Sequence, residues 1–139
     1  QDYVLDRLKF MRYAPVRFVS ALHHQGIQEL METALEVYRE RGKKVPHGEL
    51  EDVVLQAIAD HSPPRFGPHG LRIQRVTQES VNPPTFVFYV NSAKYLHFSY
   101  KRYLENTLRQ AFGFQGSHLK LEFRGRPKSP AKTAQRSKR

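Results

Sequence analysis

The sequence predicts an α+β fold in which two helices cover one face of a three-stranded sheet, in the order helix, strand, strand, helix, strand. Three patterns predict this order. Residues 85–90 form a β-branched and aromatic run that is typical of a central strand. Residues 49–61 and 99–112 carry apolar side chains at helical spacing. Residues 119–124 alternate between apolar and charged side chains, which is the pattern of a half-buried strand.

A strand–helix unit precedes this fold and is typical of the last unit of an α/β domain. Residues 15–22 predict a short buried strand, and residues 27–41 predict an amphipathic helix. The dipeptide Val45-Pro46 marks the boundary to the second unit. Because the chain begins at Gln1 within a helical pattern, we expect it to be a fragment of a longer protein.

The apolar side chains of this first unit lack partner strands. We expect Phe18, Ile27, Leu30 and Leu35 either to pack on the second unit or to stay partly exposed. In the second unit, the first helix must end near the prolines at 63–64, and residues 66–70 predict a loop. A first strand is expected at 71–77, with a connection at 82–84.

Charge and composition favour a polyanionic partner. The net charge is +10, and the stretch from Arg124 to Arg139 contains seven Lys or Arg residues and no acid. Neutralising phosphates releases counterions, so such a surface gains affinity for nucleic acid without further design. The alternative is a solubilising, disordered tail at 125–139. Cysteine is absent, which excludes disulfides and thiolate metal sites and suits a cytoplasmic location. No apolar run is long enough to span a bilayer.

Several segments resemble the C-terminal third of the bacterial Der/EngA GTPases. They are residues 13–22 (YAPVRFVSAL), 61–64, 76–78, 83–87, 90–91, 97–106 (HFSYKRYLEN) and 112–116. The resemblance implies that residues 1–44 end the second of two G domains and that 45–124 form a KH-like domain. Composition predicts that 125–139 are a basic disordered tail, since Pro, Ser, Lys and Arg cannot bury a core. The resemblance also implies a role in ribosome biogenesis, in maturation of the large ribosomal subunit.

The same resemblance implies a fifth G motif at Ser20, Ala21 and Leu22, whose backbone contacts the guanine base. The full-length family uses GTP or GDP with Mg²⁺. This chain has no Gly-x-x-x-x-Gly-Lys-Ser/Thr loop, no Asp-x-x-Gly and no Asn-Lys-x-Asp. Phosphoryl transfer needs a phosphate cradle, a Lys and a Mg²⁺ ligand, so we expect this segment alone to be no enzyme and to hold no cofactor.

Two Gly-x-x-Gly strings occur, at 67–70 and 113–116, and turn or helix-cap chemistry explains both. The KH loop that contacts phosphates is expected before the long helix, and residues 95–99 contain no glycine. RNA is therefore expected on a basic surface, with Tyr89 as a possible stacking face. The candidate RNA-binding residues are Arg72, Lys94, Lys101, Arg102, Arg109, Lys120, Arg124, Arg126 and Lys128.

The leading hypothesis is an RNA-binding module that places a GTPase on ribosomal RNA of the large subunit. The alternative is a protein-docking module that packs on the G domains of the same protein and controls their nucleotide-dependent states. The seven histidines lie singly or adjacent, without metal-ligand spacing, so no metal is expected as a partner. No membrane is expected either, because no apolar run is long enough to span one.

Overall fold

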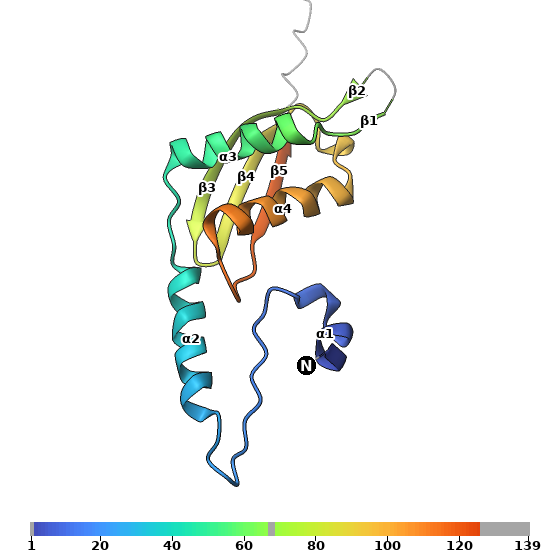
Figure 1. The fold of residues 1–139 in the computed structure, drawn as a ribbon. Coiled ribbons are helices and arrows are strands. Elements are labelled where there is room, and N and C mark those ends of the chain that lie inside the picture. The colour runs from blue at the N-terminus through green and yellow to red at the C-terminus, as the bar shows by residue number, and fades with distance from the viewer. Residues whose placement is uncertain (1, 67–68, 126–139) are drawn as a thin grey trace, which may run out of the picture.

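The computed structural model describes residues 2–66 and 69–125. Figure 1 shows two units joined by the segment at 42–46: an N-terminal unit with one long helix, and a second unit built on a sheet. The expected basic tail at 125–139 lies outside the described residues, apart from Gly125.

The second unit has the predicted helix–strand–strand–helix–strand order. Its elements are α3 (His47–Asp60), β3 (Ile73–Val81), β4 (Pro84–Val90), α4 (Phe98–Phe112) and β5 (Lys120–Gly125). The sheet order is β3-β4-β5, with β3 antiparallel and β5 parallel to β4. Helix α4 is the crossover that a parallel neighbour requires. Both helices lie on the same face of the sheet, so the predicted α+β architecture is confirmed.

The core lies between these helices and the sheet. Phe86 and Phe88 of β4 point toward the helices and are fully buried, as are Leu50 of α3 and Leu104 and Leu108 of α4. The period of two along β4 places alternate residues on this face, and the helical spacing in α3 and α4 supplies the facing side chains. The pattern in the sequence is therefore sufficient to position the sheet and its helices.

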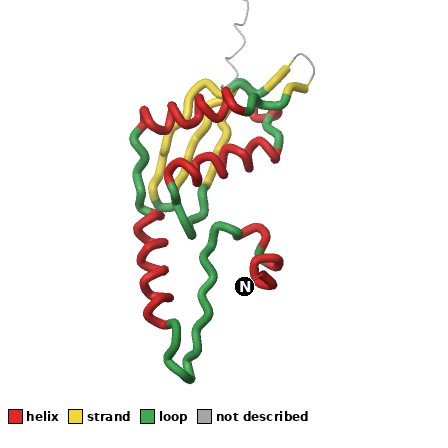
Figure 2. The backbone as a smooth tube through the Cα atoms, in the orientation of Figure 1, coloured by secondary structure: helices red, strands yellow, loops and turns green. Residues whose placement is uncertain are grey.

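The N-terminal unit differs from its prediction at residues 15–22. It contains α1 (Asp2–Arg7), the short 3₁₀ helix η1 (Lys9–Met11) and α2 (Ile27–Arg41). Residues 16–19 form an extended loop, and a single bridge joins Ser20 to Gln25 (Figure 2). The predicted strand was wrong for this chain, because a strand is stabilised by neighbours and the described residues provide none beside this segment.

The apolar side chains of this unit stay largely exposed. Phe18 is 66% exposed, and Ile27, Leu30 and Leu35 are also exposed. Of the two outcomes we expected, the structure therefore shows exposure instead of packing on the second unit.

Smaller differences concern the loops. Within the expected loop at 66–70, the described residues pair as short strands: β1 (Arg65–Phe66) is antiparallel to β2 (His69–Gly70), and residues 67–68 lie outside the described part. The strand expected at 71–77 begins at Ile73 and continues to Val81. A 3₁₀ turn, η2 (Ala93–Tyr95), precedes α4.

A joint connects the two units at the loop that follows α4. The Glu40 carboxylate accepts the Phe114 N–H at 2.7 Å, and Lys43 Nζ binds both Glu40 and the Phe112 carbonyl at 2.8–3.0 Å. These donors hold the pKa of Glu40 below its ordinary value, with the Lys43 hydrogen bond as the largest cause. The Gly116 N–H donates to the Tyr13 carbonyl at 3.0 Å.

Candidate nucleic-acid interface

The sheet face that points away from the helices carries an ion-pair network. Arg124 donates to both carboxylate oxygens of Glu79 at 2.7–2.8 Å and to Glu122 at 2.7 Å. Lys120 pairs with Glu122 at 2.7 Å. These hydrogen bonds lower the pKa of both carboxyls and raise the pKa of Arg124. Two of the predicted RNA-binding residues, Lys120 and Arg124, are therefore neutralised by acids of the same face.

The predicted stacking face of Tyr89 is occupied. The Arg75 guanidinium lies over the Tyr89 ring, 4.5 Å from its centroid. Beside it, Val87 is fully buried although its place in β4 puts it on the face away from the helices. Both observations leave little open surface on the sheet for a base.

The outer face of α4 differs from the sheet. Within residues 2–66 and 69–125, the side chains of Lys101 and Arg102 make neither an ion pair nor a hydrogen bond. Arg102 is exposed and Lys101 is half-buried. These two predicted residues keep their charge available to a ligand.

Arg109 does not point outward, which corrects its place among the expected surface cations. Its side chain is 15% exposed. The guanidinium donates to the carbonyls of Phe114 at 3.0 Å and Ser117 at 2.8 Å, pairs with Glu105 at 3.2 Å, and lies 4.2 Å from the centroid of the Tyr13 ring. Arg109 thus fastens the loop after α4 to the N-terminal unit.

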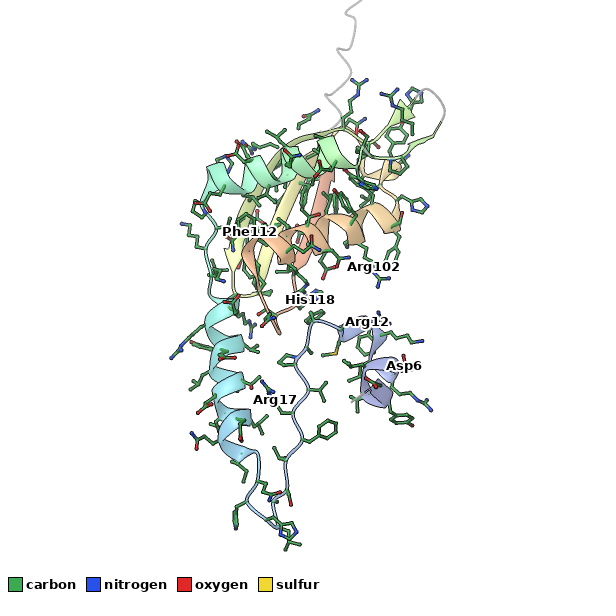
Figure 3. All side chains as sticks on the ribbon, in the orientation of Figure 1. Asp6, Arg12, Arg17, Arg102, Phe112 and His118 are labelled. Carbon is green, nitrogen blue, oxygen red and sulfur yellow. The ribbon has the colours of Figure 1, made fainter. Side chains whose placement is uncertain are left out.

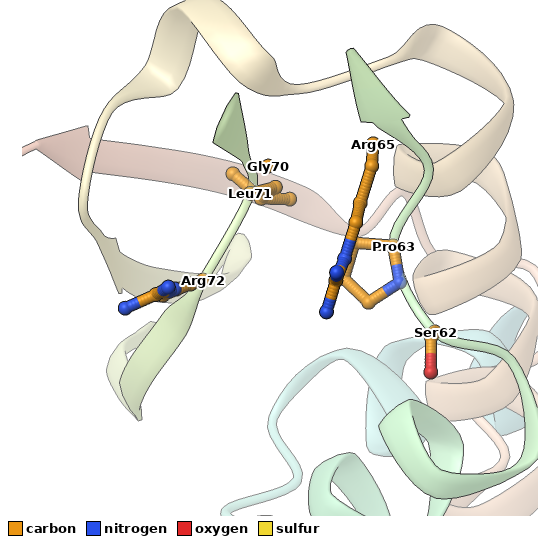
Figure 4. A pocket seen from close by; sticks show the side chains of 6 residues that line it. All are labelled: Ser62, Pro63, Arg65, Gly70, Leu71 and Arg72. Atoms are coloured by element: carbon orange, nitrogen blue, oxygen red, sulfur yellow. The ribbon is translucent and has the colours of Figure 1, made fainter. Parts of the chain in front are cut away.

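Arg72, just before β3, and Lys94, in η2, are exposed. Arg72 follows β2 and lines a small pocket with Arg65 and the Ser62 side chain. In Figure 4 the Arg65 side chain runs along Pro63 toward Ser62, whereas Arg72 points away from both. The two guanidinium groups therefore do not converge on one ligand position. The remaining predicted residues, Arg126 and Lys128, lie outside the described residues.

The fifth G motif expected at Ser20, Ala21 and Leu22 lies at a tight turn far from α4 (Figure 1). Ser20 Oγ accepts the His23 N–H at 3.3 Å, and Ala21 and Leu22 are exposed. Of the two Gly-x-x-Gly strings, 113–116 has the expected cap role, since the Gly113 N–H binds the Arg109 carbonyl. In the string at 67–70, residues 67–68 lie outside the described part, and Gly70 pairs with Arg65 in the hairpin.

A groove of about 830 Å³ separates residues 9–13 from α4. Lys9 and Arg12 form one side, and Lys101 and Arg102 form the other. Figure 3 shows Arg12 and Arg102 at the two sides of this gap, with His118 nearby. We call this site the α4 groove. Sequence reasoning missed Lys9 and Arg12, because only the packing of Tyr13 on Arg109 brings them beside α4.

Residues 2–66 and 69–125 contain no helix that is both long and apolar enough to cross a membrane. They also contain no group of three or more His, Cys, Asp or Glu side chains arranged to hold a metal ion.

Comparison with known proteins identifies relatives of this chain. A family model described as the KH-domain-like, C-terminal region of EngA bacterial GTPase enzymes matches residues 44–124. The chain is 45% identical over 124 residues to GTPase Der of Thermomicrobium roseum, covering 89% of this chain and 27% of that protein. It is 50% identical over 119 residues to GTPase Der of Clostridium botulinum strain Langeland, covering 86% and 27%. The chain therefore spans about a quarter of the length of these relatives.

Proposed function

The chain belongs to the EngA family of bacterial GTPases, whose C-terminal KH-domain-like region it contains, and from this premise we propose that this region contacts RNA for a GTPase that acts in ribosome biogenesis. The RNA proposed is ribosomal RNA of the large subunit, in the cytoplasm. The full-length protein would use GTP or GDP with Mg²⁺ on its G domains.

One observation carries the RNA proposal: four cations of the α4 groove have no acidic partner within the described ranges. They are Lys9, Arg12, Lys101 and Arg102. The two other cations that line the groove are paired, Arg109 with Glu105 and Lys120 with Glu122. Unpaired cations lose no intramolecular ion pair when they bind phosphate, whereas Lys120 and Arg124 must first leave a carboxylate. RNA is thus proposed at α4, not on the sheet.

The proposal is tested by measuring binding of the chain to large-subunit ribosomal RNA fragments at several salt concentrations. Contact with about four to six phosphates gives a log–log salt slope of about −3 to −5. The double variant Lys101→Ala, Arg102→Ala should weaken binding to all fragments alike and flatten the slope by about 1 to 2, because phosphate contacts carry no sequence information.

A control is Arg39→Ala, which removes an exposed cation from α2 that does not line the groove. It should leave both the affinity and the slope nearly unchanged. Salt-independent binding, or an equal loss from the control and the double variant, would refute RNA contact at α4. Crosslinking of the full-length protein to ribosomal RNA, with the nucleotide varied, would then locate the contact within the ribosome.

The proposal assigns no hydrolysis to this segment. Ser20, Ala21 and Leu22 would supply only a backbone contact to guanine, and the sequence lacks the other G motifs. Calorimetry with GDP should detect no binding tighter than about millimolar, the affinity of a few isolated contacts. A stoichiometric GDP complex would contradict this assignment.

A second candidate function is docking on the G domains of the same protein. It is favoured by the contacts between the KH-like region and residues 1–44, which the resemblance makes the end of the second G domain: Glu40 accepts the Phe114 N–H, and Arg109 lies over the Tyr13 ring. In that case the nucleotide state of the G domains would control how much of the basic face is exposed.

A further inference from the structure

The α4 groove carries exposed aromatic rings as well as cations. Phe98, the first residue of α4, is 77% exposed, and Phe10 of η1 is 74% exposed. Both side chains line the groove. Neither ring takes part in the hydrophobic core, and each lies within the surface that Lys9, Arg12, Lys101 and Arg102 make basic.

This combination matches one ligand chemistry. Proteins that bind single-stranded nucleic acid place cations along the phosphate backbone and aromatic rings under unstacked bases. A duplex cannot use such rings, because its bases are already stacked on one another and only backbone and groove edges face outward. Exposed Phe rings beside unpaired cations therefore select unpaired nucleotides over a helix.

We propose that the α4 groove binds a single-stranded stretch of RNA, with a base stacked on Phe98 and phosphates held by Lys101 and Arg102. This inference deepens the proposed function and rests on it: it names the kind of RNA that the same site takes. Phe10, Lys9 and Arg12 supply the opposite side, so the ligand lies between the N-terminal unit and α4. The contact of Tyr13 with Arg109 holds residues 9–13 beside α4.

The experiment compares an unstructured oligouridylate of about ten nucleotides with an RNA duplex of equal length, both fluorescently labelled and titrated with the chain. The single strand should bind more tightly. Phe98→Ala should weaken single-strand binding about tenfold, which is the usual loss for one stacked base, and should leave duplex binding and the salt slope unchanged. Lys101→Ala should weaken both and flatten both slopes.

Tyr38→Ala is the matched control, because Tyr38 is 73% exposed and lies on α2 away from the groove. A direct reading of stacking is also available. The chain has no tryptophan, so Phe98→Trp introduces the only indole, which can be excited apart from the seven tyrosines and whose emission a stacked base should quench. Tyr38→Trp should show no quenching with the same RNA.

The outcomes distinguish the single-strand inference from the proposed RNA contact on which it rests. Equal binding of strand and duplex, with no effect of Phe98→Ala and no quenching of Phe98→Trp, would overturn the single-strand inference and leave RNA contact at α4 intact. Failure of both RNAs to bind at low salt would overturn the proposed function as well. A tenfold loss confined to the single strand supports both.

Discussion

The Arg109 guanidinium binds the loop after α4 and the Tyr13 ring of the N-terminal unit, and we expect Arg109→Ala to lower the free energy of unfolding by about 3 kcal/mol. The substitution removes donors from two carbonyls, those of Phe114 and Ser117, at 3.0 and 2.8 Å. Each hydrogen bond to a charged donor contributes about 1.5 kcal/mol at the low end of its range. Loss of the cation–π contact with Tyr13 adds about 0.5 kcal/mol, and water entering the vacated site offsets part of the total.

The assay is urea unfolding followed by circular dichroism, with the free energy extrapolated to zero denaturant. Arg102→Ala is the matched control, because it removes the same side chain from an exposed position of the same helix and should change stability by less than about 0.5 kcal/mol. Arg109→Lys should recover less than half of the loss, since an ammonium group does not reproduce the planar fork. A loss below about 1 kcal/mol for Arg109→Ala, or equal losses at the two positions, would refute the reasoning.

Three further predictions concern the joint and the first unit. Glu40→Gln should lower the free energy of unfolding by about 1–2 kcal/mol at neutral pH. Because folding lowers the pKa of Glu40, the stability that its carboxylate contributes is present above the ordinary pKa of 4.5 and is lost as pH falls through the folded pKa. The variant should therefore show a flatter curve of stability against pH over that acidic range, and a curve like that of the unmodified chain would contradict the contact. Gly116→Ala should destabilise the fold by at least about 1 kcal/mol in thermal unfolding, because φ is +73° and a methyl group there would overlap the Val37 side chain of α2. Gly48→Ala has open space around it and should be neutral or stabilising. Equal effects of the two variants would count against the packing of the loop after α4. Hydrogen exchange should find the amides of 16–19 far less protected than those of 86–90, and similar protection would show that the first segment is paired.

Lys101 and Arg109 show that helical periodicity predicts which residues are polar-facing but not which of them stay available to a ligand. Both residues lie on the polar stripe of α4, two turns apart, and helical periodicity treats them alike. Their environments differ because the chain after α4 turns back at Gly113 and Gly116 and presents carbonyls to Arg109. Nothing in the local pattern of α4 encodes that return.

The sheet gives a second example. Alternation along β5 correctly placed Lys120 and Arg124 on the face away from the helices. It did not indicate that Glu79 of β3 reaches the same Arg124, because that contact depends on how the outer two strands register on β4. Charge counting alone therefore overstated how much positive charge this face offers.

By itself, the sequence determined the order of helices and strands in the second unit, because buried strands and amphipathic helices carry their periodicity in neighbouring residues. Tertiary structure alone decided which cations are available. Arg109 is engaged by the loop that follows α4 and by Tyr13, and Arg124 by Glu79 of β3, whereas Lys9 and Arg12 are brought beside Lys101. It also decided that residues 16–19 form no strand, since β structure depends on a neighbour that local sequence cannot supply.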